Sequence, residues 1–272
     1  MNRGLAWLRA LADGSEGGNG TVRAADVSWD DERARLVCVV PDAQARFPRA
    51  RAGQVGVEEG WKIAAAIRAA VDADAIDATR GVQPRAIIAL VDVPGQAFGY
   101  HEEALGLHES LAAAADAYAS ARLAGHPVVA LIVGKAISGA FLAHGLQAGA
   151  LIALDDAGIE VHVMSQASVA RVTRRSEEEV AALANVVPAT ARDVHAFAQL
   201  GALDRLLGVE NADVPTADDV RKARSLLLQT LRDLRACERG PADRLGNEAA
   251  GRTRAMSIRV RQLLEAQWDA PA

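Results

Sequence analysis

The sequence predicts an α/β fold in which short buried strands alternate with helices. Two runs rich in Val, Ile and Leu, residues 87–93 and 128–133, end at a Pro and a Gly, as buried parallel strands commonly do. Each run leads through a glycine-containing corner into a stretch whose apolar residues have helical spacing. Other parallel architectures, such as a doubly wound sheet, share this local pattern, so periodicity alone does not choose between them.

The N-terminal segment, residues 1–11, predicts a short amphipathic helix, and a glycine-rich flexible break should follow at residues 14–20. We expect the helix to pack on the domain or on a partner, because its large apolar residues need cover. They are Leu5, Trp7, Leu8 and Leu11. The first predicted strand follows at residues 35–40, where Pro41 ends it.

A loop at residues 46–60 is rich in Arg and Gly and leads into a helix at about residues 61–75. Its arginines either contact a phosphate group or belong to a solvated loop, and both readings stay open. They are Arg46, Arg49 and Arg51.

Two central helices follow the two apolar runs. The first should end near Gly125 and bury one face, because its apolar residues recur with helical spacing. Those residues are Leu107, Leu111, Ala114 and Tyr118. The second should span about residues 139–148 and end at Gly149, with Phe141 and Leu142 as core candidates.

The rest of the chain predicts mostly helix. Short strands are expected at residues 150–154, 159–163 and 202–208, and long helices at 217–237 and 251–268. Polar residues followed by acidic ones mark three expected helix starts. These are Ser176 with Glu179, Thr190 and Thr216. The leucine-rich stripes of the last two helices suggest packing on the domain or on another subunit.

Composition excludes several classes of protein. A net charge of −5 and a pI of about 5.7 give no basic surface for nucleic acid. No apolar run approaches the ~20 residues of a membrane span, and residues 1–11 are a poor secretory signal. With two cysteines, Cys38 and Cys237, no disulfide framework is indicated. We therefore expect a soluble cytoplasmic protein.

The two corners, residues 94–100 and 134–140, are the candidate chemical site. Where a strand gives way to a helix, backbone N–H groups at the helix start are unpaired, and two of them aimed at one oxygen form an oxyanion hole. We expect one arm at Ala97, Phe98 and Gly99 and the other at Ile137, Ser138 and Gly139. Tight turns alone would also explain the glycines.

Other chemistry fits the residues less well. Position 129 is Val, so a phosphate loop lacks its first glycine, and Ala136 and Ala140 replace the glycines of a hydrolase elbow around Ser138. Ser138 is better read as a helix N-cap or a backbone donor. None of the six histidines has zinc-site spacing, so no metal is expected. His101, beside the first corner, is a candidate proton donor.

At these corners the chain resembles carboxyltransferases of the crotonase superfamily, and most closely the gamma subunit of biotin-independent malonate decarboxylase. The resemblance is carried by Val91-Asp92-Val93-Pro94-Gly95, Tyr100-His101-Glu102-Glu103 and Gly134-Lys135-Ala136-Ile137-Ser138-Gly139-Ala140. It implies a crotonase-like β-β-α spiral. On this basis we expect an N-terminal segment (1–20), a carboxyltransferase-type domain (21–210) and a C-terminal helical arm (211–272).

The resemblance also implies a function. Such a subunit takes part in decarboxylating a malonyl thioester to an acetyl thioester and CO2 through an enolate, without biotin or metal. The malonyl group would arrive on the phosphopantetheine arm of an acyl carrier protein, with a related beta subunit and an acyl-transferase alpha subunit in the complex. Further substrate-binding candidates are Gly95, Tyr100, Gly134, Ala136 and His144.

Two alternatives remain at this point. The acetyl-CoA carboxylase carboxyltransferase alpha subunit is similar in the same places, but typically has Gly-Gly-Ser-Gly-Gly where this chain has residues 136–140. That departure favours the decarboxylase. A non-catalytic scaffold subunit is the other alternative, in which the same substitutions mark a lost site.

Overall fold

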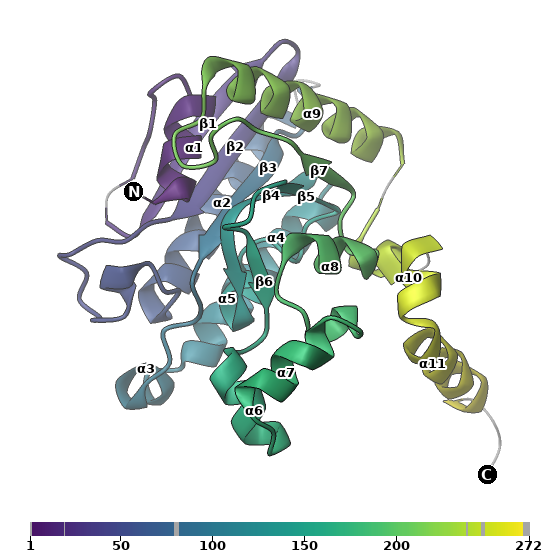
Figure 1. The fold of residues 1–272 in the computed structure, drawn as a ribbon. Coiled ribbons are helices and arrows are strands. Elements are labelled where there is room, and N and C mark those ends of the chain that lie inside the picture. The colour runs from purple at the N-terminus through teal and green to yellow at the C-terminus, as the bar shows by residue number, and fades with distance from the viewer. Residues whose placement is uncertain (1, 19, 79–81, 238, 246–247, 269–272) are drawn as a thin grey trace.

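The computed structural model describes residues 2–18, 20–78, 82–237, 239–245 and 248–268, and a central sheet organises them (Figure 1). Within these residues seven strands form one sheet in the order β1-β2-β3-β4-β5-β7, and β6 pairs with the end of β4. The strands are β1 (Val22–Trp29), β2 (Glu32–Val39), β3 (Ala86–Val93), β4 (Val128–Ile137), β5 (Ala150–Leu154), β6 (Glu160–His162) and β7 (Arg205–Leu207).

The sheet is parallel except at one edge. β1 and β2 form an antiparallel hairpin that turns at Asp30, whose φ is 51°. From β2 to β7 every pairing is parallel, which places the ends of β3 and β4 side by side. The sequence analysis predicted every strand except β1, and it predicted β2 three residues late. The two expected corners therefore leave neighbouring strands.

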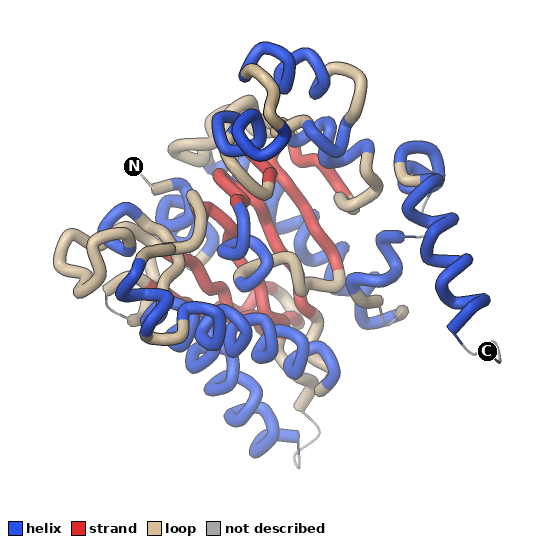
Figure 2. Tube along the Cα trace, turned by 90° about the horizontal axis from the view of Figure 1, so that it is seen from below, coloured by secondary structure: helices blue, strands red, loops and turns tan. Residues whose placement is uncertain are grey.

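Helices cover both faces of the sheet (Figure 2). On β2, Cys38 lies against α1, whereas Arg35 donates from the opposite face to the Ala66 carbonyl of α2 at 2.9 Å. The helices are α1 (Arg3–Leu11), α2 (Val57–Ala78), α3 (Tyr100–Ala104), α4 (Leu107–Leu123), α5 (Ser138–Ala143), α6 (Gln166–Thr173), α7 (Glu177–Ala184), α8 (Val194–Gln199), α9 (Ala217–Ala236), α10 (Glu248–Thr253) and α11 (Ala255–Trp268). No helix in the described part of the chain is long and apolar enough to cross a membrane.

The N-terminal helix α1 packs back on the sheet, against β2, β3, β4 and α9. Its large side chains Trp7, Leu8 and Leu11 are fully buried, and the Trp7 indole donates to the Ala212 carbonyl at 2.9 Å. Asn2 caps the helix by accepting the Leu5 N–H at 2.9 Å. The expected amphipathic helix is thus confirmed, with the domain as its cover.

Several expected helix boundaries were wrong. The helix predicted to end near Gly125 is confirmed as α4, but the short helix α3 before it was not predicted, and Gly106, with a φ of 83°, separates the two. The second-corner helix α5 ends at Ala143 and not near Gly149, and Leu142 is half-exposed. The C-terminal helix is interrupted at residue 254, between α10 and α11.

The helix caps had mixed outcomes. Ser176 and Thr216 both form capping boxes, with Glu179 and Asp219 as the reciprocal partners. Thr190 starts no helix, because it closes a 3-10 turn and donates its hydroxyl to the Val187 carbonyl. The 3-10 turns are η1 (Ala50–Ala52), η2 (Pro188–Thr190) and η3 (Pro241–Leu245).

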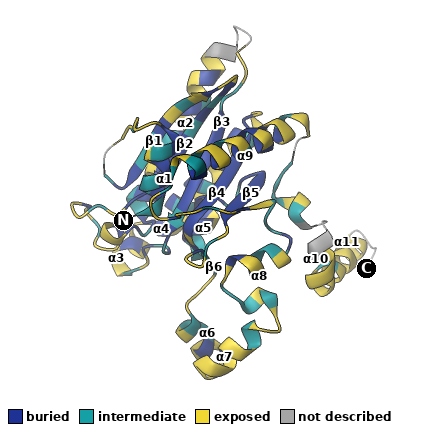
Figure 3. Cartoon of the chain, turned by 45° about the horizontal axis from the view of Figure 1, so that its top comes forward, coloured by how far each residue is buried: buried dark blue, intermediate teal, exposed yellow. Residues whose placement is uncertain are grey.

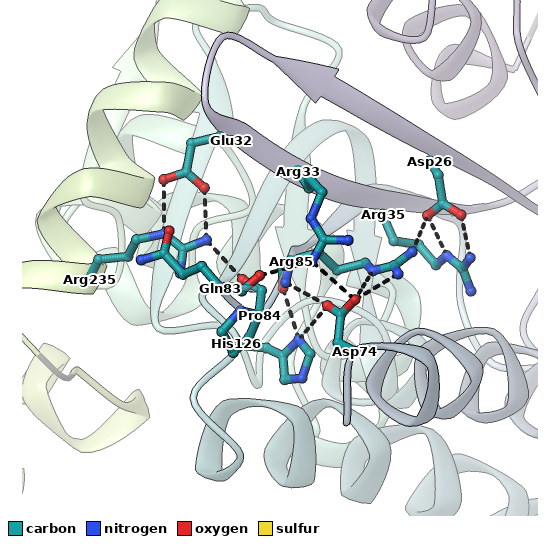
Figure 4. A network of polar contacts seen from close by, with 10 residues as sticks. All are labelled: Asp26, Glu32, Arg33, Arg35, Asp74, Gln83, Pro84, Arg85, His126 and Arg235. Carbon is teal, nitrogen blue, oxygen red and sulfur yellow. Dashed lines mark hydrogen bonds and ion pairs between the residues drawn. The ribbon is translucent and has the colours of Figure 1, made fainter. Parts of the chain in front are cut away.

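A network of ion pairs closes the sheet at the end opposite the corners (Figure 4). Asp74 of α2 is almost fully buried and accepts the Arg85 N–H at 2.6 Å and its guanidinium at 2.7 and 2.9 Å. Arg33 reaches the same carboxylate at 3.3 Å. A second pair joins Arg235 of α9 to Glu32 through two hydrogen bonds of 2.8 Å.

Two helical segments project from this body. Figures 1 and 3 show α6 and α7 extending beyond the corner end of the sheet, and α10 and α11 extending from another side. None of the residues described in α11 is buried, although its sequence carries an apolar stripe. Among its exposed side chains are Met256, Val260, Leu263, Leu264 and Trp268.

Candidate active site

The first corner is held by a backbone bridge to the segment before α2. Val55 donates to the Gly95 carbonyl at 3.0 Å, and Ala97 donates back to the Val55 carbonyl at 2.8 Å. Gly95 has a φ of 138°, which other residues rarely adopt. The Phe98 N–H donates to the Gln96 carbonyl at 3.0 Å. The N–H groups of Ala97 and Phe98 are thus both engaged within the chain.

The outer side of the first corner is exposed. Gly99 is the N-cap residue of α3, and no side chain caps it. Tyr100 and His101 follow at the surface, with their rings edge to face and 5.6 Å apart. The Arg49 guanidinium lies 4.2 Å from the centre of the Phe98 ring, which is itself half-exposed.

The second corner is shaped by Asp92. The pairing of β3 with β4 shifts register between Val91 and Val93, and Asp92 accepts the Lys135 N–H there at 3.1 Å. A side chain at Gly134 would collide with the Asp92 carboxylate. The same carboxylate accepts the Arg3 N–H at 3.0 Å. Gly134 therefore leaves room for the Asp92 carboxylate, which links β3 to the start of α1 and to the second corner.

Beyond this join, two donors converge on one oxygen. The Gly139 N–H donates to the Gln96 side-chain oxygen at 2.8 Å, and the Ser138 hydroxyl lies 3.3 Å from the same atom. We call this arrangement of Ser138, Gly139 and Gln96 the oxygen cradle. It joins the two corners, because Gln96 belongs to the first and the donors belong to the second.

The backbone at the cradle is unusual. Ser138 has a φ of 59°, which is uncommon for a residue with a side chain and is often retained at functional sites. A Cβ on Gly139 would coincide with the Gln96 oxygen. Ile137, and not Ser138, is the N-cap residue of α5, so the expected N-cap role of Ser138 was wrong.

A cavity of about 380 Å³ opens beside the cradle, between α5 and the layer made by α6, α7, η2 and α8. Its wall is mostly apolar, which suits a site that excludes water. The main apolar side chains are Phe141, Leu142, Val161, Met164, Val180 and Phe197. Ser138 and Gly139 form part of the same wall.

A charged cluster borders the cavity, and two of its members, His162 and Arg192, line the wall. Arg192 donates from one nitrogen to Glu160 at 2.9 Å and to the His162 Nε2 at 2.8 Å, and the Lys135 ammonium lies 3.8 Å from Glu160. Because a guanidinium only donates, His162 Nε2 must accept. No metal-ligand cluster of three His, Cys, Asp or Glu side chains occurs in the described part of the chain.

The cluster's protonation follows from its contacts. Burial and the neighbouring Arg192 charge lower the pKa of His162, so its imidazole is neutral at pH 7. Burial would raise the pKa of Glu160, but the Arg192 hydrogen bond and the Lys135 charge outweigh it and the pKa is lowered. With Arg192 and Lys135 positive and Glu160 negative, the cluster carries one net positive charge.

Comparison with known proteins identifies the family. A family model described as malonate decarboxylase gamma subunit matches residues 50–268. The chain belongs to this family. It is 48% identical to a chain of a Pseudomonas malonate decarboxylase hetero-tetramer solved with coenzyme A, covering 98% of this chain and 100% of that one at a TM-score of 0.90. As a malonate decarboxylase gamma subunit, the chain is part of a decarboxylase complex.

Two further proteins are less similar to the chain. The chain is 37% identical over 213 residues to the malonyl-S-ACP:biotin-protein carboxyltransferase MADD of Malonomonas rubra, covering 76% of this chain and 69% of that protein. Transcarboxylase 12S has the same fold at 17% identity and a TM-score of 0.61, covering 87% of this chain and 42% of that one. The expected crotonase-like carboxyltransferase fold with helical C-terminal segments is thereby confirmed.

The candidate residues of the gamma subunit lie at the two corners, which Gln96 joins, but the His144 side chain is engaged in the core. His144 is fully buried, and its Nδ1 accepts the Tyr118 hydroxyl at 2.9 Å while Nε2 donates to the Leu90 carbonyl at 3.1 Å. Burial lowers the pKa of His144 to about 4. Ala136 is also fully buried, but it contributes to the cavity wall.

Three residues of the gamma subunit site were missed by sequence reasoning. Gln96 was part of the first corner's motif, but its side chain carried no signal that it crosses to the second corner. Arg192 lies far along the chain and follows no motif. Glu160 lies within the strand expected at residues 159–163, but nothing in its sequence marked it as a site residue, and the pairing of β6 with β4 places it beside Lys135.

Proposed function

We propose that this gamma subunit supplies an oxyanion site for decarboxylation of a malonyl thioester. The observation that carries the proposal is the oxygen cradle, where the Gly139 N–H and the Ser138 hydroxyl already hold one carbonyl oxygen. In the working complex the thioester oxygen takes the place of the Gln96 oxygen. The second corner, with Ile137, Ser138 and Gly139, is then the principal arm.

The chemistry asks little else of the protein. When the bond between the carboxylate carbon and the methylene carbon breaks, CO2 leaves and the electron pair of that bond stays with the methylene carbon. This pair forms the carbon–carbon double bond of the enolate, and the carbonyl π electrons move onto the thioester oxygen. Each preorganised donor on that oxygen stabilises the transition state by about 3 kcal/mol. Protonation of the enolate carbon then gives the acetyl thioester.

The first corner has a smaller part in this proposal. Because the N–H groups of Ala97 and Phe98 are engaged, Gly99 is its remaining candidate donor. His101 is the proposed proton donor, since it is exposed close to Gly99 and histidine is the side chain most often used for proton transfer in catalysis. Tyr100, whose ring lies against that of His101, is proposed to contact the substrate beside it.

The proposed assembly follows the family. The Pseudomonas relative is a hetero-tetramer solved with coenzyme A, and MADD is named for a malonyl-S-ACP substrate. We therefore propose a related beta subunit as the direct partner, an acyl carrier protein with a phosphopantetheine arm as the substrate carrier, and an acyl-transferase alpha subunit in the larger cytoplasmic complex. No resident cofactor or metal is proposed for the gamma subunit.

Substitution of Gly139 by Val tests the proposal. The added side chain would occupy the space of the oxygen held in the cradle, so Gly139→Val should lower kcat at least 100-fold in the complex with the beta subunit. Gly208→Val is the matched control, because nothing lies within 4 Å of a Cβ there. Wild-type turnover by Gly139→Val in an intact complex would remove the second corner from the active site.

A second candidate function is carboxyltransfer to biotin, and the identity with MADD favours it over an inert scaffold. The enolate and its cradle would be shared by both reactions, but the CO2 would move to a biotinyl partner. Turnover that needs added biotinyl protein would select this alternative. A scaffold would tolerate Gly139→Val.

A further inference from the structure

We infer that the cavity beside the oxygen cradle is the subsite for the carboxylate end of the malonyl group, and that Arg192 binds this carboxylate. The inference rests on the proposed function, because it places the thioester oxygen in the cradle. It adds a carboxylate-binding residue, which would let the site distinguish a malonyl thioester from an acetyl thioester, because the two differ only by the carboxylate.

The cavity has the right position. Ser138 and Gly139 belong both to the oxygen cradle and to the cavity wall. If the thioester oxygen is held in the cradle, the malonyl group attached to the same carbonyl carbon can extend into the cavity. Arg192 lines the same cavity. The pairing of Ile137 with His162 fixes the charged cluster next to the second corner.

Arg192 is presented to the cavity with hydrogen-bonding capacity to spare. Glu160 and His162 both accept from the same terminal nitrogen, which orients the guanidinium. Its Nε and other terminal nitrogen have no hydrogen-bond acceptor among the described residues, and 35% of the side chain is accessible. A planar guanidinium held in this way can take a carboxylate through two parallel hydrogen bonds.

The surrounding charges favour an anion. Glu160 neutralises one of its two cationic neighbours, Arg192 and Lys135, and the neutral His162 adds no negative charge. Of these charged groups only Arg192 lines the mostly apolar cavity, and in such surroundings its charge attracts a carboxylate more strongly than it would in water. The apolar remainder of the wall suits CO2, which leaves uncharged.

Direct binding of two thioesters tests the inference. In the complex of this chain with its beta partner, calorimetry would measure the Kd of malonyl-CoA and of acetyl-CoA. Arg192→Gln should weaken malonyl-CoA binding about 10- to 100-fold and leave acetyl-CoA binding within about twofold. Arg192→Lys should recover part of the loss. Arg175→Gln, at an exposed arginine of the same helical layer, is the control and should change neither.

Each outcome decides the matter. Equal weakening of both thioesters would show that Arg192 only supports the wall, and unchanged malonyl-CoA binding would show that the carboxylate binds elsewhere; either result overturns the inference. The measurement needs no turnover. If the complex discriminates malonyl-CoA through Arg192 while Gly139→Val leaves turnover intact, the proposed placement of the thioester oxygen in the cradle fails, whereas carboxylate binding by Arg192 is upheld.

Discussion

Among individual residues, Gln96 decides whether the oxygen cradle is open. Its side-chain oxygen fills the position proposed for the thioester oxygen, at 2.8 Å from the Gly139 nitrogen. Substrate must therefore displace one hydrogen-bonded amide before it can bind. A hydrogen bond of this kind contributes about 1 kcal/mol net.

Removal of the Gln96 side chain should thus favour substrate. We expect Gln96→Ala to lower the KM for the malonyl thioester about fivefold and to leave kcat within about twofold, because the cradle no longer has to be cleared. Steady-state kinetics of the complex would measure both constants. Gln44→Ala, at an exposed loop position, is the control. A large fall in kcat for Gln96→Ala would mean that the amide itself acts in catalysis.

His144 makes a second prediction, about pH. The folded protein holds it with a pKa of about 4, whereas an unfolded chain has a histidine pKa of about 6.5. Between these values the unfolded chain binds a proton that the folded one does not, so stability falls on acidification. Urea unfolding should show the wild type losing about 3 kcal/mol more than His144→Gln between pH 7 and pH 4.

The control for this prediction is His108→Gln, since His108 is exposed. That variant should follow the wild-type pH profile. Parallel profiles for wild type and His144→Gln would mean that His144 is protonated in the folded protein, contrary to its buried contacts with Tyr118 and Leu90.

Roles of single residues were the hardest feature to predict from sequence. The glycines of the second corner leave room for side chains of the first strand unit, because Gly134 accommodates Asp92 and Gly139 accommodates Gln96. The Asp92 contact lies at a register shift between β3 and β4, which no local pattern reveals. The N-cap expected at Ser138 was wrong for a different reason, because β4 continues through residue 137.

At the scale of elements, the apolar strands and two of the three helix caps were predicted correctly from the sequence, whereas the strand β1 was not. β3 and β5 are almost wholly buried, so their sequences are continuously apolar. β1 was missed because it is an edge strand in which Val22, Ala25 and Trp29 are buried without regular alternation, and polar and small residues separate them. The short α5 was extended too far because apolar residues continue past its end.

The ion network around Asp74 joins α2 to β2 and to the start of β3, and it yields an element-scale prediction. Burial alone would raise the pKa of Asp74, but the hydrogen bonds from Arg85 lower it, so its stabilisation is present at pH 7 and lost as pH falls through that lowered value. Asp74→Asn should lower the free energy of unfolding by about 3 kcal/mol at pH 7, because the half-buried Arg85 would keep only Asp26, at 3.3 Å, as an acidic partner.

Chemical unfolding at pH 7 would measure this loss. Asp72→Asn, an exposed aspartate in the same helix, should change stability by less than about 0.5 kcal/mol. If Asp74→Asn were equally mild, the pairing of Arg85 with Asp74 would contribute nothing to holding α2 on the sheet.

For the whole molecule, the sequence predicted the architecture and the neighbourhood of the site. Parallel strands in chain order place both corners at one end of the sheet, as expected from two strand-to-helix units. The cavity could not be predicted, because its far wall is built from α6, α7 and α8, whose sequences show only ordinary helical spacing. The division at residues 20 and 210 stays a prediction.

The central claim is that this gamma subunit takes part in biotin-independent decarboxylation. The most direct test is to measure CO2 and acetyl-thioester release from a malonyl thioester by this chain co-expressed with its beta partner, with avidin added to sequester biotin. We predict turnover that avidin does not reduce and that neither subunit shows alone. No turnover from an intact complex, with activity restored by a biotinyl protein in the absence of avidin, would contradict the account.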